Sequence, residues 1–151
     1  MEKKAERILL FIKYSIVASW LVAIAVAVCG ELSLFTDYVV EPKSEEEFVL
    51  NSVAICLTIF GVPLTLKFFT LCTRHSLRRM DNDEALSRLL RYALVRNFTL
   101  CVIAVADLFA YYLTFNIAGA MCALVVGVVM LLMCWPKRTY IASYLEKVNE
   151  E

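Results

Sequence analysis

The sequence predicts an all-α integral membrane protein, folded as a four-helix bundle with both chain ends in the cytoplasm (N-in/C-in). Two observations support this prediction. The 151-residue chain is 61% hydrophobic with a mean hydropathy of +0.70, which is more apolar surface than a soluble domain of this size buries. Residues 67–96 form one strongly basic interruption, with seven of the fifteen Lys and Arg residues against three acids. Basic segments stay in the cytoplasm, so this segment orients the helices that flank it.

The first predicted span covers residues 8–30 and is interrupted only by Lys13. At about 1.5 Å per residue it is about 34 Å long, enough to cross a hydrocarbon core of about 30 Å. Lys13 lies near the cytoplasmic edge, where its side chain can extend to the headgroups. Small residues recur every four positions and predict a helix-packing face, formed by Ser15, Ser19, Ala23 and Ala27.

Residues 31–47 hold six acids against Lys43 alone and predict a solvated outer loop. The second span, residues 48–66, runs back to the inside. Gly61 and Pro63 lie within it and predict a hinge, because proline removes a helix donor and clashes with the preceding turn.

Residues 67–96 are expected to form a basic cytoplasmic hairpin, the helical extension between the second and third spans. Asp81 and Glu84 match a capping box, so an amphipathic helix is expected to lead into the third span. Depending on its orientation, the hairpin projects into the cytoplasm or lies on the membrane surface. The predicted lipid- or partner-binding residues are Arg74, Arg78, Arg79, Arg88 and Arg91.

The third span, residues 97–115, contains Asp107 near the middle of the membrane. An ionised carboxylate costs at least about 2.5 kcal/mol there, so Asp107 is expected to face protein or water. Two interpretations stay open: a neutral or hydrogen-bonded structural acid, and a titrating functional site. The candidate intramembrane polar site comprises Asp107, Tyr111, Thr114, Asn97 and Lys13.

The fourth span covers residues 118–135, and residues 136–151 form the cytoplasmic tail. Gly119, Ala123 and Gly127 recur every four residues and predict a second close-packing face. Six scattered cysteines lack the spacing of a metal site, and we expect no metal or cofactor. Cys29 and Cys122 both lie near the outer face, where a disulfide would form if their helices touched.

The sequence loosely resembles a group of uncharacterised small four-span membrane proteins of Bacteroidales-type bacteria, over about the last two thirds of the chain. The resemblance rests on Pro63-Leu64, the helix after the basic turn, Tyr111-Tyr112-Leu113 and Cys134-Trp135-Pro136-Lys137-Arg138. It implies a four-span topology and a bacterial inner (plasma) membrane, and it transfers no catalytic residue.

These features predict a non-enzymatic structural or accessory protein, because no nucleophile lies beside a recognisable base. Its expected partners are membrane lipids and either further copies of itself or a larger membrane protein, with no role for nucleic acid. The alternative is a subunit of an oligomeric ion- or proton-coupled small transporter or channel that uses Asp107.

Overall fold

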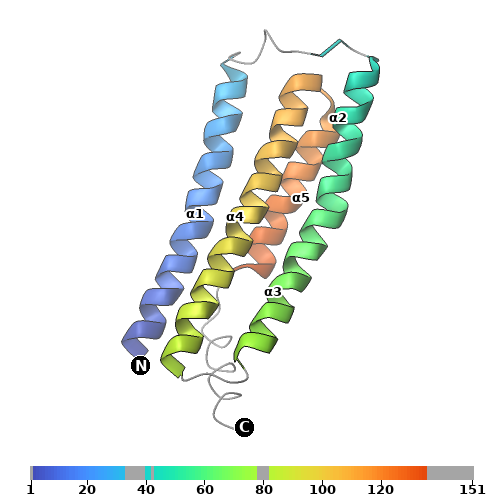
Figure 1. Ribbon diagram of the computed structural model, residues 1–151. Coiled ribbons are helices and arrows are strands. Elements are labelled where there is room, and N and C mark those ends of the chain that lie inside the picture. The colour runs from blue at the N-terminus through green and yellow to red at the C-terminus, as the bar shows by residue number, and fades with distance from the viewer. Residues whose placement is uncertain (1, 33–39, 42, 78–81, 136–151) are drawn as a thin grey trace.

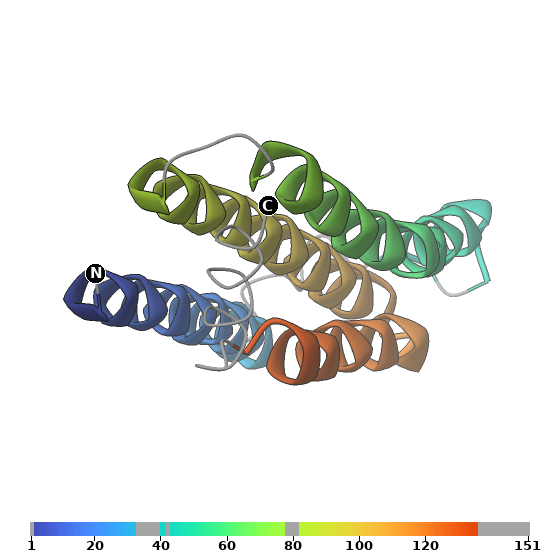
Figure 2. The ribbon, with the colours of Figure 1, turned by 90° about the horizontal axis from the view of Figure 1, so that it is seen from below.

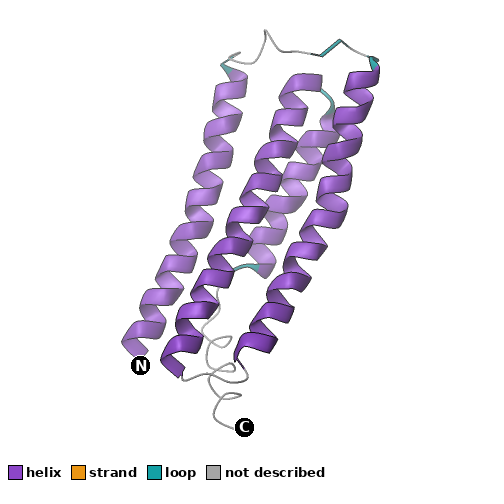
Figure 3. Ribbon diagram, viewed as in Figure 1, coloured by secondary structure: helices purple, strands orange, loops and turns teal. Residues whose placement is uncertain are grey.

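The computed structural model describes residues 2–32, 40–41, 43–77 and 82–135, and within them the chain is helical and contains no strand (Figures 1 and 3). The second and third helices are joined by a π-helical turn into one continuous helix. The elements are α1 (Glu2–Glu31), α2 (Glu45–Cys56), the π turn η2 (Leu57–Gly61), α3 (Val62–Leu77), α4 (Asn82–Thr114) and α5 (Ile117–Met133).

Three of the four predicted spans have the length and composition to cross a membrane. They correspond to Glu6–Glu31, Glu45–Thr73 and Ser87–Thr114. The fourth, α5, is shorter, with 17 residues and a length of about 26 Å. The predicted all-α fold is therefore confirmed, with three helices that are long and apolar enough to cross a membrane and a shorter final helix.

The predicted basic hairpin is continuous with the helices on either side of it. α3 extends the second span to Leu77, and α4 begins at Asn82, well before the predicted start of the third span. In Figure 1 both helices project beyond the lower end of α5.

α4 lies at the centre of the bundle (Figure 2). It packs against α1 on one side, against the continuous α2–α3 helix on the other, and along α5. The core joins Ile16 of α1, Phe69 of α3, Leu100 of α4 and Val126 of α5. Large apolar side chains cover the outside, as expected for a surface in contact with lipid.

Side-chain caps fix two helix starts at the upper end of the bundle. Ser44 accepts a hydrogen bond from the backbone N–H of Glu47 at 3.1 Å, and the Glu47 carboxylate accepts one from the backbone N–H of Lys43 at 2.6 Å. Asn116 accepts from the backbone N–H of Ala118 at 3.1 Å and so begins α5. These contacts satisfy donors that helix starts leave open.

Candidate polar site within the bundle

Asp107 is buried at the middle of α4, with none of its side chain exposed. The Thr58 hydroxyl donates to its Oδ2 at 2.6 Å. Its other oxygen, Oδ1, is buried without a hydrogen-bond partner. Thr58 belongs to the π turn, and such turns are often found at functional sites. The site is therefore a buried acid held by one hydroxyl from an irregular turn of the neighbouring helix.

A third element, α5, covers Asp107 from another side. A Cβ placed on Gly119 would lie 2.7 Å from the backbone oxygen of Asp107 and 2.8 Å from the backbone nitrogen of Tyr111. Only glycine allows the two helices to come this close. One turn further along α5, the Cys122 thiol lies beside Thr58 and Asp107. The enclosure of Asp107 is thus complete within one chain.

A second group of polar contacts joins the same helices toward the upper end of the bundle. The Thr114 hydroxyl donates to the backbone oxygen of Ala110 at 2.8 Å and lies 3.3 Å from the Asn51 side-chain oxygen, so the two acceptors share its one proton. Beyond it, the Asn116 amide donates to the Glu47 carboxylate at 3.4 Å. Polar contacts therefore resume about 10 Å beyond Thr58 along its helix and extend to a carboxylate at the end of the bundle.

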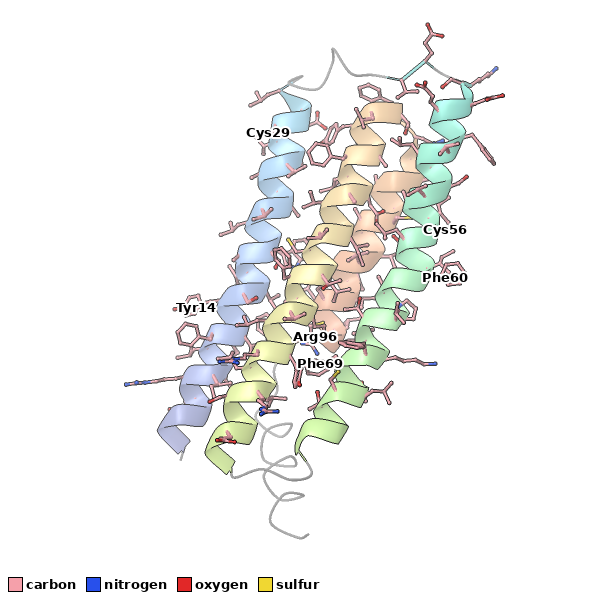
Figure 4. All side chains as sticks on the ribbon, in the orientation of Figure 1. Tyr14, Cys29, Cys56, Phe60, Phe69 and Arg96 are labelled. Atoms are coloured by element: carbon pink, nitrogen blue, oxygen red, sulfur yellow. The ribbon has the colours of Figure 1, made fainter. Side chains whose placement is uncertain are left out.

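A buried arginine forms a third polar group, toward the lower end. Arg96 is 8% exposed, and its guanidinium lies 4.3 Å from the centroid of the Phe69 ring. Figure 4 shows both side chains between α4 and α3, whereas Phe60 points out of the bundle. Arg96 also donates to Asn97 Oδ1 and to the backbone oxygen of Cys134, each at 3.4 Å.

These contacts follow one antiparallel register between α4 and the α2–α3 helix. We call this contact line the long seam. Its residues on α4 recur at helical spacing on one face, so they meet their partners in reverse order along the other helix. The pairs are Asn51 with Thr114, Thr58 with Asp107, Gly61 with Ile103 and Phe69 with Arg96.

Two members of the predicted polar site contact aromatic rings. Lys13 places its Nζ 5.8 Å from the Trp135 ring centroid, at the lower end of the bundle. The Tyr111 ring packs edge-on against that of Tyr112, with 4.9 Å between centroids.

The remaining two members are distributed along α4. Thr114 belongs to the upper polar group, and Asn97 is fully buried beside Arg96, with its Nδ2 unpaired. The structure therefore divides the predicted set among separate contacts and leaves Asp107 with Thr58.

The predicted small-residue stripe of α1 is half-buried, and two of its members have backbone oxygens that contact α4. The Ser19 backbone oxygen accepts from the Cys101 thiol at 3.9 Å, and that of Ala27 accepts from the Tyr112 hydroxyl at 2.9 Å. The stripe consists of Ser15, Ser19, Ala23 and Ala27.

On α5 the predicted small residues meet two different neighbours. Gly119 contacts the α4 backbone, whereas a Cβ on Gly127 would lie 3.1 Å from the Trp20 ring of α1. Ala123 is half-buried between them. Cys29 and Cys122 are free thiols. Among the described residues, no group of His, Cys, Asp or Glu side chains is arranged to hold a metal ion.

The predicted hinge residues stand at the end of the π turn. Gly61 closes η2 and Pro63 follows as the second residue of α3. Pro63 has no N–H to donate to Ile59, and this missing bond accompanies the departure from α-helical geometry.

The predicted cationic residues are only partly within the described chain. Arg88 and Arg91 are exposed on α4. Arg78 and Arg79 lie outside the described residues, as does the side chain of Arg74.

Sequence reasoning did not identify Thr58, Asn51 or Arg96 as site residues. A usable signal existed for the first two, because they are seven residues apart on one helix, the spacing of a continuous packing face. For Arg96 the signal was its distance of eleven residues from Asp107, which places both on one face of α4.

Comparison with known protein families, curated proteins and solved structures finds no match to this chain.

Proposed function

We propose that this chain is a small non-enzymatic accessory protein of a bacterial inner membrane, with both termini in the cytoplasm, whose basic end binds anionic lipid or a protein partner. The observation that supports it most is the segregation of charge along the bundle. Arg88 and Arg91 are exposed near the start of α4, and Lys67 is exposed on α3, in the same half of the bundle. The described part of the opposite end carries one cation, Lys43, and the acids Glu31, Glu41, Glu45, Glu46 and Glu47.

Cations that border a membrane span attract anionic headgroups. Each Lys or Arg near the surface contributes about 1 kcal/mol, and the long arginine side chains can keep their apolar stems against the helix. Lipid retention is therefore the property to measure first.

The test is native mass spectrometry of gently extracted protein, comparing retained phosphatidylglycerol with retained phosphatidylcholine. Arg88→Gln combined with Arg91→Gln should lower phosphatidylglycerol retention by roughly five-fold for each arginine, as about 1 kcal/mol apiece implies. Lys43→Gln is the matched control, an exposed cation at the acidic end, and should leave retention unchanged. Equal retention by the double variant and wild type would refute lipid binding by α4. A larger protein in the native complex would instead identify the partner.

A second candidate function is proton-coupled transport at Asp107. The specific observation in its favour is a fully buried carboxyl with one unpartnered oxygen. Intramembrane acids of this kind commonly mark proton or ion pathways.

The second candidate is tested by proton flux into proteoliposomes. Asp107→Asn should abolish coupled flux while thermal stability stays near that of wild type. Lost stability with unchanged flux would place Asp107 in the packing alone.

A further inference from the structure

The long seam differs on the two sides of Asp107. Toward the upper end, the next interhelical contacts are polar, first between Thr114 and Asn51 and then between Asn116 and Glu47. Toward the lower end, Ile103 and Leu100 follow on α4, and both are buried. A proton moves along hydroxyl, amide and carboxyl groups and water, and packed aliphatic side chains block it.

The step between Asp107 and the upper polar pair is short and lined by small side chains. Asn51 and Thr58 are separated by about 10 Å along their helix. The buried residues between the two pairs are Ala54 on α2 and, on α4, Ala110 and Tyr112, whose hydroxyl donates to the Ala27 backbone oxygen of α1. Each alanine side chain is a single methyl group, and the Ala110 carbonyl accepts from Thr114.

The step toward the lower end is longer and closed by larger groups. Val62 and Ile103 are buried on either side of it, and the Ile103 side chain lies 3.0 Å from the Cβ position of Gly61. Beyond Leu100, the Arg96 guanidinium packs on Phe69. A fixed positive charge at this position also repels a proton.

The polar groups that face Asp107 come from two neighbouring elements. The π turn contributes the Thr58 hydroxyl and α5 the Cys122 thiol. Among the described charged residues, Arg96 lies on the same face of α4 at about 16 Å, and Glu47 is at the far end of the upper polar contacts. The protonation of Asp107 is therefore governed by its access to water.

We propose that Asp107 takes up and releases a proton only through the Glu47 end of the long seam, and that the Arg96 end is closed. The proposal rests on the second candidate function, because it specifies the end of the bundle through which the proton of that site enters and leaves. The step is a simple protonation, in which a proton from water at the Glu47 end adds to the carboxylate oxygen and leaves by the same route. In the structure the Thr58 hydroxyl donates to Oδ2 of this acid.

The test uses a lipophilic carbodiimide, which dissolves in the membrane and forms a stable adduct with a protonated carboxyl when fluctuations of the helices open the enclosed site to it. Sealed vesicles of one orientation are prepared, and protease cleavage of the segment between α1 and α2 reports which compartment contains the Glu47 end. The pH of each compartment is then varied separately, and the adduct at Asp107 is measured by peptide mass spectrometry. Asp107→Asn gives the background.

Labelling of Asp107 should rise when the compartment at the Glu47 end is acidified, and it should not change with the pH of the other compartment. Thr114→Val and Asn51→Leu should slow this response several-fold. Thr70→Val is the matched control, because the Thr70 hydroxyl is exposed and bonds only to the backbone of its own helix. Thermal unfolding of each variant checks that it is folded.

The possible failures separate the proposal from the function on which it rests. Labelling that follows the Arg96 compartment, or both compartments equally, would overturn the proposed direction while keeping Asp107 as a proton site. Labelling that does not depend on the pH of either compartment, or that equals the Asp107→Asn background, would overturn both. An unchanged response in Thr114→Val and Asn51→Leu would remove the upper polar contacts from the route.

Discussion

Arg96 is a cation buried inside the bundle, where burial costs several kcal/mol unless it is compensated. Three contacts provide that compensation. The Phe69 ring lies under the guanidinium, the Asn97 side chain accepts one hydrogen bond, and the Cys134 carbonyl accepts another. Cys134 is the C-cap of α5, so the arginine also meets the negative end of a helix dipole. The arginine thereby joins α3, α4 and α5 at one point.

A double-mutant cycle measures the Arg96–Phe69 contact. Arg96→Gln and Phe69→Leu should each destabilise the protein, and their effects should be coupled by about 1 kcal/mol, because the cation–π contact needs both partners. The measurement is the free energy of unfolding in bicelles. Phe68→Leu is the control, since this neighbouring ring is exposed and should not couple to Arg96. Additive effects of Arg96→Gln and Phe69→Leu would mean that the ring does not bind the cation.

At the same scale, the sequence identifies Asp107 but not its partner. A carboxylate inside an apolar run is recognisable by its cost in lipid. A threonine is not, because its hydroxyl can bond the backbone carbonyl four residues before it and is then satisfied within its own helix. Thr65, Thr70 and Thr73 make that bond here. Only packing against α4 distinguishes Thr58 from them.

The π turn is the main departure from regular geometry at the scale of elements. It lies between the α2 residues that contact the upper half of α4 and the α3 residues that contact its lower half. A π turn accommodates an extra residue in the helix, so it changes the angular relation between the two halves. With it, Asn51, Thr58 and Phe69 all face α4. The sequence predicted an irregularity here from Gly61 and Pro63, but not that it would carry Thr58.

The close contact between α4 and α5 gives a prediction at the same scale. Gly119→Ala should destabilise the bundle by about 2 kcal/mol or more, because the new methyl group meets backbone atoms that cannot rotate away. Gly127→Ala should cost less, because its methyl group meets the end of the Trp20 side chain, which can shift. Thermal unfolding in detergent gives the order of the two. A larger loss for Gly127→Ala would mean that α5 packs on α1 more tightly than on α4.

For the whole molecule, composition and periodicity were enough to predict four helices and approximate boundaries. Apolar length determines where a span is possible, and this quantity can be read from the sequence. The face that each span buries was harder to predict. Asn97 and Thr114 were expected in one polar site with Asp107, whereas the structure places one beside Arg96 and the other with Asn51. Three neighbours surround α4, so more than one of its faces is buried. Hydropathy alone does not tell which buried residue faces which neighbour.

The charge distribution leads to a prediction for the orientation of the whole molecule. The proposed orientation, with both termini in the cytoplasm, predicts that a fluorescent protein fused after Glu151 is bright and that alkaline phosphatase at the same position is inactive. Exchanging Arg74, Arg78, Arg79, Arg88 and Arg91 for Gln should shift part of the population toward the opposite orientation, because cations near the spans set the orientation. Lys43→Gln should leave it unchanged or reinforce it, since it removes the one described cation at the acidic end.

Active phosphatase after Glu151 in the unmodified chain would reverse the proposed orientation. The result also shows which compartment the Glu47 end of the long seam faces, because Glu47 lies at the opposite end of the bundle from Arg91 (Figure 1). Cytoplasmic termini place the Glu47 end outside the cell, so the proton of Asp107 would exchange with the outer solution. The reverse orientation would leave the same residues facing one another and would connect Asp107 to the cytoplasm instead.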